Sequence, residues 1–296
     1  MEFVSPTDGP YILCQGKKWL DFSSCDFLGL AQHPEVKKAV IKYTLKYGVG
    51  LPVAPLGSAQ QQQLEGKLAQ FLGMETAVLF PSFEEALMKV KQLKATLISS
   101  DSEEFASLSN KKSLICVDDS FTIGVKGEHG FGIAAHQKGI DLITGSLAYG
   151  VGCSGAFVAA SKKILAEVTA SQPLSFPAIG ALDSALSFML EMTPERETLV
   201  SHCQWLGKQL KDLPAHMMTS PRVILEFKSE KEALLARQLF LEGQIFLAPP
   251  QGSTLYLAVT ALHTPDDLDQ LAGVLKKLSA TDWALAMQSL TPGPSK

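Results

Sequence analysis

The sequence predicts an α/β protein in which a large domain with a mostly parallel sheet is followed by an α+β domain. Two observations support this class. The apolar spacing switches repeatedly between the strand period and the helix period from residue 77 to residue 170, which is typical of a sheet covered by helices on both faces. Helical and strand patterns then alternate again after residue 186. The 296 residues, 46% hydrophobic and 19% charged, suffice for the core of one or two soluble domains.

The N-terminal segment, residues 1–46, is expected to contain one short strand and one helix. The strand begins at Trp19. The helix follows His33, because Pro34 suits the first turn of a helix and Glu35 lies near the positive end of the helix dipole.

The large domain is assigned to residues 47–185. It opens with an irregular loop at residues 47–58, which contains three glycines and two prolines, and with a helix from Gln60 to Leu72 that ends at Gly73. The strands expected next cover residues 77–80, 95–98, 113–117, 142–144 and 156–160. The remaining helices are expected at residues 84–93, 103–108, 162–170 and 178–192.

The C-terminal α+β domain is assigned to residues 186–284. Its helices are expected at residues 195–213, 230–241 and 266–278, and its strands at residues 222–227 and 254–259. Residues 285–296 form a polar tail that we expect to be disordered.

Charge and cysteine usage exclude several classes of protein. The net charge is −4 and no basic run exceeds a lysine pair, so we expect no nucleic-acid partner. The scattered cysteines and histidines lack metal-ligand spacing, which predicts reduced thiols, no metal and a cytoplasmic protein. They include Cys14, Cys25, Cys116, Cys153, Cys203, His129, His136, His202, His216 and His263. We expect no signal peptide and no membrane partner, because no apolar run approaches the ~20 residues of a membrane span.

The most informative stretch runs from residue 141 to residue 157. Six of its residues stand at the spacing found around the cofactor lysine of the α-oxoamine synthases, the family of 8-amino-7-oxononanoate synthase and serine palmitoyltransferase. These residues are Asp141, Ser146, Leu147, Gly150, Gly152 and Gly155. The stretch therefore resembles that family, yet Tyr149 stands at the lysine position. A phenol cannot form a Schiff base.

Other stretches extend the resemblance over nearly the whole chain. They are residues 21–30 with His33, residues 47–71, residues 117–132, Pro249-Pro250, and Thr260 with His263. Because their order and spacing match the family, the resemblance implies a fold-type-I, aminotransferase-like PLP-transferase with a shortened large domain. It also implies pyridoxal phosphate as the cofactor and an acyl-CoA and an amino acid as the substrates.

The resemblance implies a set of cofactor-facing positions. Asp118 stands where a carboxylate keeps the pyridinium nitrogen protonated, and Ser82 and Ser146 stand near the phosphate. Phe121 replaces the histidine that contacts the phenolic oxygen of the ring. Of this set, only Asp118 and the two serines are available to hold a cofactor.

Substrate and phosphate positions also depart from the family. Cys25 and Ala248 replace the asparagine and the arginine that hold the amino-acid carboxylate. Glu84 and Glu85 would bring negative charge toward the phosphate. The chain is also short by some tens of residues between Phe80 and Val117, where the family carries a strand and the histidine that stacks on the cofactor.

Simpler interpretations remain for the aspartates and the tyrosine. The Asp118-Asp119 pair could form a solvated turn, although the register with the family favours a cofactor-facing origin for Asp118. We interpret Tyr149 as a packing residue that plugs a vacated pocket rather than as a catalytic group. Ser146 could satisfy a turn only.

Two further features of the sequence have weaker support. The glycines of residues 150–155 fit the dinucleotide pattern G-x-G-x-x-G, but a strand rather than a helix is expected to follow them. Lys126, Lys162 and Lys163 are the nearest lysines that could substitute for the missing one.

We therefore predict a catalytically degenerate homologue of a PLP-dependent acyltransferase. The resemblance implies a homodimer, or a heterodimer with a lysine-bearing paralogue. The alternatives are a non-catalytic partner subunit of an active homologue, a working enzyme with an altered site, and a scaffold that needs no cofactor.

Overall fold

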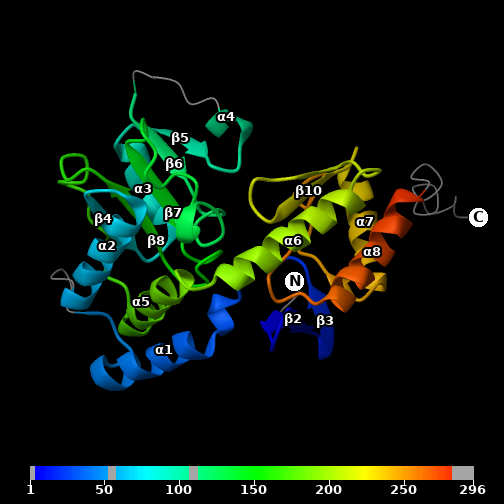
Figure 1. The fold of residues 1–296 in the computed structure, drawn as a ribbon, viewed down its shortest axis with the longest axis horizontal. Coiled ribbons are helices and arrows are strands. Elements are labelled where there is room, and N and C mark those ends of the chain that lie inside the picture. Colours follow the sequence, from blue (N-terminus) through cyan, green and yellow to red (C-terminus); the bar gives the residue numbers. More distant parts are fainter. Residues whose placement is uncertain (1–3, 53–57, 107–112, 282–296) are drawn as a thin grey trace, which may run out of the picture. The chain divides into compact units, whose positions relative to one another are not determined.

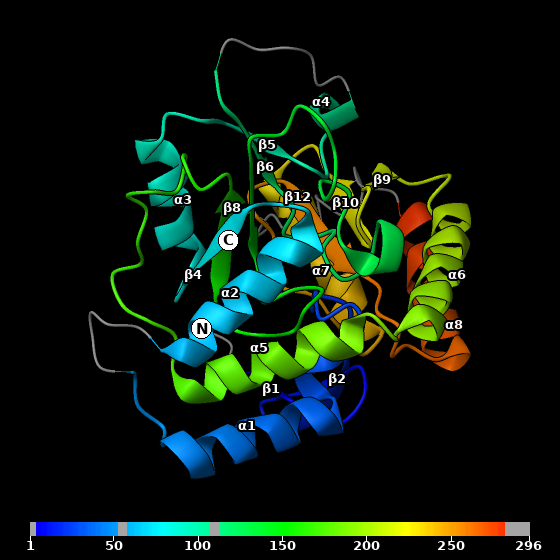
Figure 2. The same cartoon turned by 60° about the vertical axis from the view of Figure 1, so that its left-hand side comes forward.

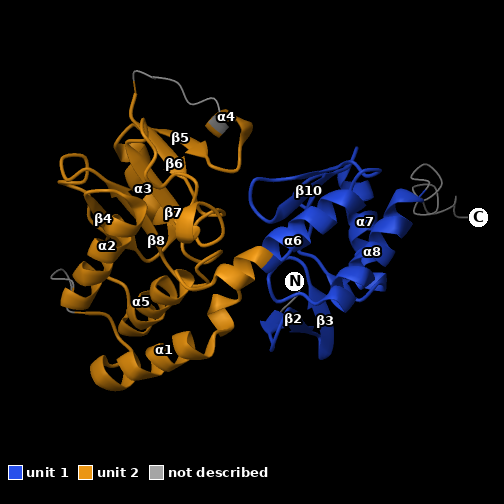
Figure 3. Ribbon diagram, viewed as in Figure 1, with its two compact units in different colours: residues 1–24, 198–296 blue, residues 25–197 orange. Residues whose placement is uncertain are grey.

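The computed structural model describes residues 4–52, 58–106 and 113–281. The chain is built of two compact units, one formed by Met1–Ser24 with Thr198–Lys296 and the other by Cys25–Glu197. Figure 1 labels the elements, and Figure 3 colours the two units. These units differ from the sequence-based boundaries after residues 46 and 185. The N-terminal boundary differs because helix α1 (Pro34–Tyr47) packs along helix α5 (Phe176–Met189) within the Cys25–Glu197 unit, as Figure 2 shows.

The Cys25–Glu197 unit contains a five-stranded sheet of order β4-β8-β7-β6-β5. Its strands are β4 (Thr76–Phe80), β5 (Thr96–Ser99), β6 (Ile115–Asp118), β7 (Leu142–Ser146) and β8 (Ala156–Ala160). Strands β5, β6 and β7 are parallel, whereas β8 runs antiparallel to both β7 and β4. The α/β class is confirmed, and the sheet is mixed, with half of its pairings parallel.

The helices of this unit begin and end where the sequence signals lie. Besides α1 and α5, they are α2 (Ala59–Leu72), α3 (Phe83–Gln92), α4 (Glu103–Ala106) and the 3-10 turns Leu30–Gln32 and Glu128–Gly130. His33 caps α1 by accepting from the Glu35 amide at 3.3 Å, and Gly73 ends α2 in the left-handed region. The predicted continuation of α4 to residue 108 lies outside the described residues.

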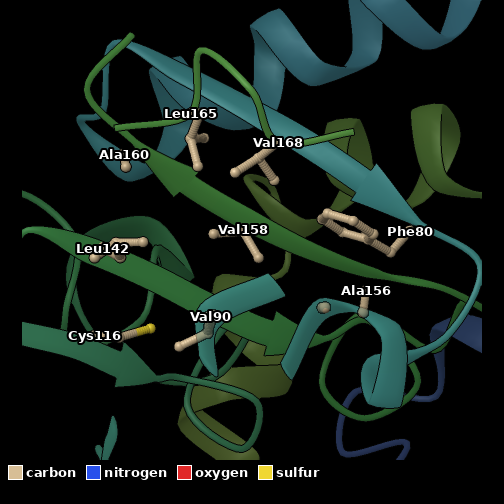
Figure 4. Close-up of a cluster of buried hydrophobic side chains, with 10 residues drawn as sticks. Phe80, Val90, Cys116, Leu142, Ala156, Val158, Ala160, Leu165 and Val168 are labelled. Atoms are coloured by element: carbon tan, nitrogen blue, oxygen red, sulfur yellow. The ribbon is translucent and has the colours of Figure 1, made fainter. Parts of the chain in front are cut away.

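The predicted helix at residues 162–170 is wrong. This segment forms turns, with Leu165 and Val168 buried against the sheet. Figure 4 shows both side chains over β8, near Val158. The three-residue spacing of two apolar side chains imitates a helix, but here their burial on the sheet determines the backbone path.

The other unit combines two small sheets with long helices. One sheet has the order β1-β2-β3-β11 and the other β12-β10-β9. Their strands are β1 (Val4–Pro6), β2 (Tyr11–Cys14), β3 (Lys17–Asp21), β9 (Ala215–Met217), β10 (Arg222–Glu226), β11 (Ile245–Phe246) and β12 (Thr254–Ala258). The helices are α6 (Thr193–Gln209), α7 (Glu230–Glu242) and α8 (Pro265–Ser279). The first residues of α6 belong to the Cys25–Glu197 unit.

No helix within residues 4–52, 58–106 and 113–281 is both long enough and apolar enough to cross a membrane. The predicted disordered tail, residues 285–296, lies outside the described part of the chain.

Candidate functional site

Two of the sequence-predicted positions meet at the carboxyl ends of neighbouring parallel strands. Asp118 is the last residue of β6 and Ser146 the last of β7, and Asp118 pairs in register with Thr144. In sheets of this kind, ligands bind outside the carboxyl ends of the strands. The location expected for a cofactor is therefore present in the fold.

A buried hydroxyl connects these two strand ends. Ser120 donates from its amide (3.0 Å) and from its Oγ (2.5 Å) to Oδ1 of Asp118, and its Oγ accepts from the Ser146 amide at 2.8 Å. The Asp118 carboxylate is thus engaged by a residue of its own turn. Sequence reasoning did not single out Ser120, although the Asp-x-Ser spacing at a strand end is a known signal for such a turn.

Two aromatic rings face one another beside this network. The Phe121 and Tyr149 rings are stacked, with centroids 4.4 Å apart and planes inclined by 12°. Phe121 comes from the turn after β6 and Tyr149 from the turn after β7, and both side chains are half-buried. An aromatic pair of this geometry contributes about 1 kcal/mol beyond the area it buries. The structure therefore joins the two positions by apolar packing.

Asp119 is a structural carboxylate. It is fully buried, it accepts from the Thr122 hydroxyl, and its Oδ2 accepts from the Ala134 amide at 3.2 Å. Burial raises the pKa of Asp119, and the hydrogen bonds from Thr122 and Ala134 oppose that shift. The interpretation of the aspartate pair as a solvated turn therefore applies only to Asp118. Asp119 is buried and holds the loop that runs from Thr122 to Ala134.

The N-terminus of α3 carries the segment matched to the phosphate-binding turn. Ser82 caps the helix by accepting from the Glu85 amide at 3.3 Å. Glu84 is exposed, whereas Glu85 is buried and accepts from the amide (2.5 Å) and the Oγ (2.9 Å) of Ser171. Two carboxylates therefore occupy the end of a helix that would otherwise attract an anion.

We predict that Glu85→Ala lowers the free energy of unfolding by about 2 kcal/mol, because two hydrogen bonds from the exposed Ser171 to the buried Glu85 carboxylate are lost, and a hydrogen bond to a charged group contributes ~1.5–3 kcal/mol. Glu84→Ala removes a neighbouring exposed carboxylate from the same helical turn and is expected to change stability by less than about 0.5 kcal/mol. Urea unfolding of both variants would test this. Equal effects would mean that Glu85 contributes nothing through Ser171.

Comparison with known proteins finds relatives that cover most of the chain. No family model matches the chain. The 8-amino-7-oxononanoate synthase of Acidithiobacillus ferrooxidans is 25% identical over 362 residues, covering 93% of this chain and 92% of the relative. That of Thermoanaerobacter pseudethanolicus is 26% identical over 359 residues, covering 91% and 90%. The chain is therefore similar over more than 90% of its length to 8-amino-7-oxononanoate synthases.

Solved structures agree in fold. A serine palmitoyltransferase from S. paucimobilis, bound to a PLP–myriocin aldimine, superimposes with a TM-score of 0.82 at 16% identity over 97% of this chain and 93% of the neighbour. The 8-amino-7-oxononanoate synthase of Francisella tularensis gives a TM-score of 0.74 at 16% identity over 92% and 99%. The predicted aminotransferase-like fold is confirmed.

The chain is shorter than its relatives. The alignment with the Acidithiobacillus protein spans 362 residues, more than the 296 of this chain. The Acidithiobacillus protein therefore carries residues that have no counterpart in this chain.

Two of the substitute lysines lie far from the family's lysine position. Strand β8 is antiparallel to β7, with Ala160 opposite Leu142. Residues that follow β8 therefore lie at the opposite edge of the sheet from Ser146, about 15 Å away along the strand. Lys162 and Lys163 lie there and are exposed. Lys126 is half-buried in the loop that Asp119 fastens.

The remaining predicted positions are not brought together within one unit. Cys25 is half-buried at the start of the Cys25–Glu197 unit, and Ala248 is exposed after β11 in the other unit. The G-x-G-x-x-G pattern is followed by strand β8, whereas a dinucleotide-binding motif is followed by a helix. Its Gly152 serves close packing, because a Cβ there would come within 2.5 Å of the Ala31 amide nitrogen.

Proposed function

We propose that this chain is a catalytically silent member of the α-oxoamine synthase family, with its cofactor position occupied by its own aromatic side chains. The observation that carries this proposal is the Phe121–Tyr149 stack at 4.4 Å. The family's chemistry starts from a lysine amine at the position of Tyr149, and a phenol cannot replace an amine in a Schiff base.

The residues present do not fit pyridoxal phosphate. Asp118 is retained as a carboxylate, but its Oδ1 already accepts two hydrogen bonds from Ser120. The α3 N-terminus presents Ser82 together with two glutamates, and negative charge at that end of a helix disfavours a phosphate dianion. We infer that Ser146 and Ser82 now serve local structure, as acceptors for the Ala148 and Glu85 amides.

The residues that would hold the carboxylate of an amino-acid substrate are also replaced. An amino-acid carboxylate is best held by a bidentate arginine, and the corresponding position is Ala248. With Cys25 at the asparagine position, neither a side-chain amide nor a guanidinium remains for that carboxylate. We therefore expect no acyl transfer from an acyl-CoA to an amino acid.

A role as partner subunit is the second candidate, and the conserved architecture favours it. The fold superimposes over 97% of the chain with a TM-score of 0.82, although the site residues have changed. A fold that is retained after catalytic activity is lost can still support a subunit interface. The candidate assemblies are a homodimer and a heterodimer with a lysine-bearing paralogue, and co-expression with such a paralogue followed by size-exclusion chromatography would distinguish them.

Titration with pyridoxal phosphate tests the proposed silence. We expect no visible band that survives borohydride reduction and dialysis, in the parent protein or in Tyr149→Lys, because the new amine would face Phe121 and because the glutamates at the α3 N-terminus disfavour the phosphate. An active 8-amino-7-oxononanoate synthase provides the positive control. A reduced adduct on any lysine of the parent, located by mass spectrometry, would revive the altered-enzyme alternative.

Tyr149→Lys separates two versions of the proposal. If this variant alone regains a reducible band, only the lysine has been lost and the pocket is otherwise intact. Circular dichroism of the variant shows whether it keeps the parent fold, so that absence of a band is attributed to the pocket rather than to unfolding.

A further inference from the structure

The two edges of the five-stranded sheet differ in how they are protected. At the β4 edge, the Leu79 amide donates to Oε1 of Glu65 at 3.0 Å, so a side chain of helix α2 pairs with the outward-facing backbone. Strand β5 forms the other edge, beside β6 (Figure 1). A strand edge that is left unprotected is a template for pairing with another chain.

Backbone groups of β5 point away from the sheet without a partner. The amides of Thr96 and Ser100 donate to carbonyl oxygens on the β6 side, at 2.8 and 2.9 Å. Because backbone groups alternate in direction along a strand, the N–H groups of Leu97 and Ser99 and the carbonyl of Leu97 point outward. No residue within the described ranges 4–52, 58–106 and 113–281 pairs with these three groups.

Strand β5 also lacks the features that usually protect an edge. It contains no charged residue and no proline, and it pairs with residues 115–118 one to one, without a bulge. The Leu97 side chain is 42% exposed, whereas Ile98 on the opposite face is 2% exposed. The centre of the edge therefore combines unpaired backbone groups with an exposed apolar side chain.

The two ends of β5 are oppositely charged. Lys91 and Lys94 precede the strand, Glu103 and Glu104 follow it, and all four are exposed. When two copies of β5 are paired antiparallel, the lysines of one copy lie beside the glutamates of the other, and this happens twice. A parallel arrangement would place like charges together. The edge is thus complementary to itself in the antiparallel direction.

We propose that β5 pairs antiparallel with β5 of a second copy of this chain, so that one sheet continues across a two-fold axis. With the axis at Leu97, the N–H of each Leu97 donates to the carbonyl of the other. Each Ser99 N–H donates to the Ala95 carbonyl of the other copy. The two Leu97 side chains lie opposite each other on one face and lose contact with water.

This contact is isologous, because the same edge serves both copies, and it therefore closes at two. It uses none of the residues of the candidate site, so it does not depend on whether that site is silent. Four residues from each copy make a small interface. We therefore expect reversible association at concentrations on the order of 10–100 µM.

Sedimentation velocity of the full chain between about 1 and 200 µM tests the pairing. The mean mass is expected to double over this range, starting from that of the smallest species. Leu97→Lys should weaken association at least about tenfold, since it removes the apolar contact and places two like charges at the axis. Leu234→Lys is the matched control, because Leu234 is an exposed leucine of helix α7, at 48% exposure. It should associate as the parent does.

The charged ends of β5 provide a second set of variants. Glu103→Lys places lysines on both sides of the contact and is expected to weaken association about fivefold. The double variant Lys94→Glu with Glu103→Lys exchanges the two signs and should recover most of the loss. Circular dichroism of each variant shows whether it keeps the parent fold.

Hydrogen exchange measured by mass spectrometry locates the contact. At the higher concentration, the fragment that contains β5 should hold about two more protected amides, those of Leu97 and Ser99, and the β4 fragment should be unchanged. The proposal is overturned if the mass of the parent is constant over the range, or if Leu97→Lys and Leu234→Lys associate equally. It is also overturned if the copies associate without added protection of β5, since they then meet at another surface.

Discussion

Replacing Gly132 by alanine is expected to lower the free energy of unfolding by about 4 kcal/mol, since backbone strain of ~1–2 kcal/mol adds to an overpacking cost of ~1–3 kcal/mol. Gly132 has a φ of +89°, and a Cβ at this position would overlap Oδ2 of Asp119. Asp119 cannot withdraw without releasing the Thr122 hydroxyl and the Ala134 amide, and it would then be a buried carboxylate without its donors.

Gly139→Ala isolates the steric part of this effect. Gly139 has a φ of +85°, close to that of Gly132, but an added Cβ would meet nothing within 4 Å. Only the strain of the left-handed conformation, ~1–2 kcal/mol, is expected there. Urea unfolding followed by circular dichroism compares the two variants. Equal losses of stability would refute the view that Asp119 and Gly132 fasten the loop.

Local sequence signals were sufficient for most helices and for the five strands of the β4-β8-β7-β6-β5 sheet, whereas β1, β2, β9 and β11 were not predicted. The Pro34 start of α1 and the Gly73 end of α2 were both confirmed, because each depends on the conformational limits of one residue. Of the hairpin formed by β2 and β3, the sequence predicted only strand β3. Its turn at Gln15 and Gly16 has positive φ at both residues (51° and 75°), the pattern of a tight hairpin, and the Gly16 signal was present in the sequence.

Strand direction could not be obtained from apolar spacing. Strand β8 has the same buried, apolar pattern in either direction, so periodicity alone suggested a mostly parallel sheet. The link between β7 and β8, residues 147–155, is too short for the crossover that parallel neighbours require, which ~12 residues or more would supply. Loop length thus contained the information that the periodicity lacked.

The candidate site shows the same division between local and non-local information. The end positions of Asp118 and Ser146 follow from strand boundaries, and the structure places them on adjacent strands. The Ser120 link and the Phe121–Tyr149 stack depend on how two turns meet in space. No spacing in one sequence encodes that meeting, so the sequence predicted a packing role for Tyr149 without its partner.

His263 is expected to make the protein lose stability as the pH falls from about 6.5 to about 4. The side chain is 3% exposed, it stacks on Phe22 with centroids 4.1 Å apart, and its Nδ1 accepts from the Thr260 amide at 3.0 Å. Its Nε2 therefore carries the proton and donates to the Asp21 carbonyl at 3.0 Å. Burial lowers the pKa of His263 to about 4.

The sign of this effect follows from proton binding. Between the two pKa values the unfolded chain binds a proton that the folded protein does not, so acid favours unfolding. The contribution is fully present above about pH 6.5, falls with pH, and is lost below about pH 4, for a total of about 3 kcal/mol. Asp26 acts in the opposite direction, because burial raises its pKa to about 6 and favours the folded state at low pH.

Comparison with a non-titrating variant removes such opposing groups. In His263→Asn the amide oxygen can accept from Thr260, and the stability difference between parent and variant should shrink by about 3 kcal/mol from pH 7 to pH 4. His216→Asn, at an exposed position of β9, should leave the pH profile unchanged. If the difference between parent and His263→Asn does not vary with pH, the imidazole is protonated in the folded state over this range, and its burial between Phe22 and the Asp21 carbonyl must tolerate the charge.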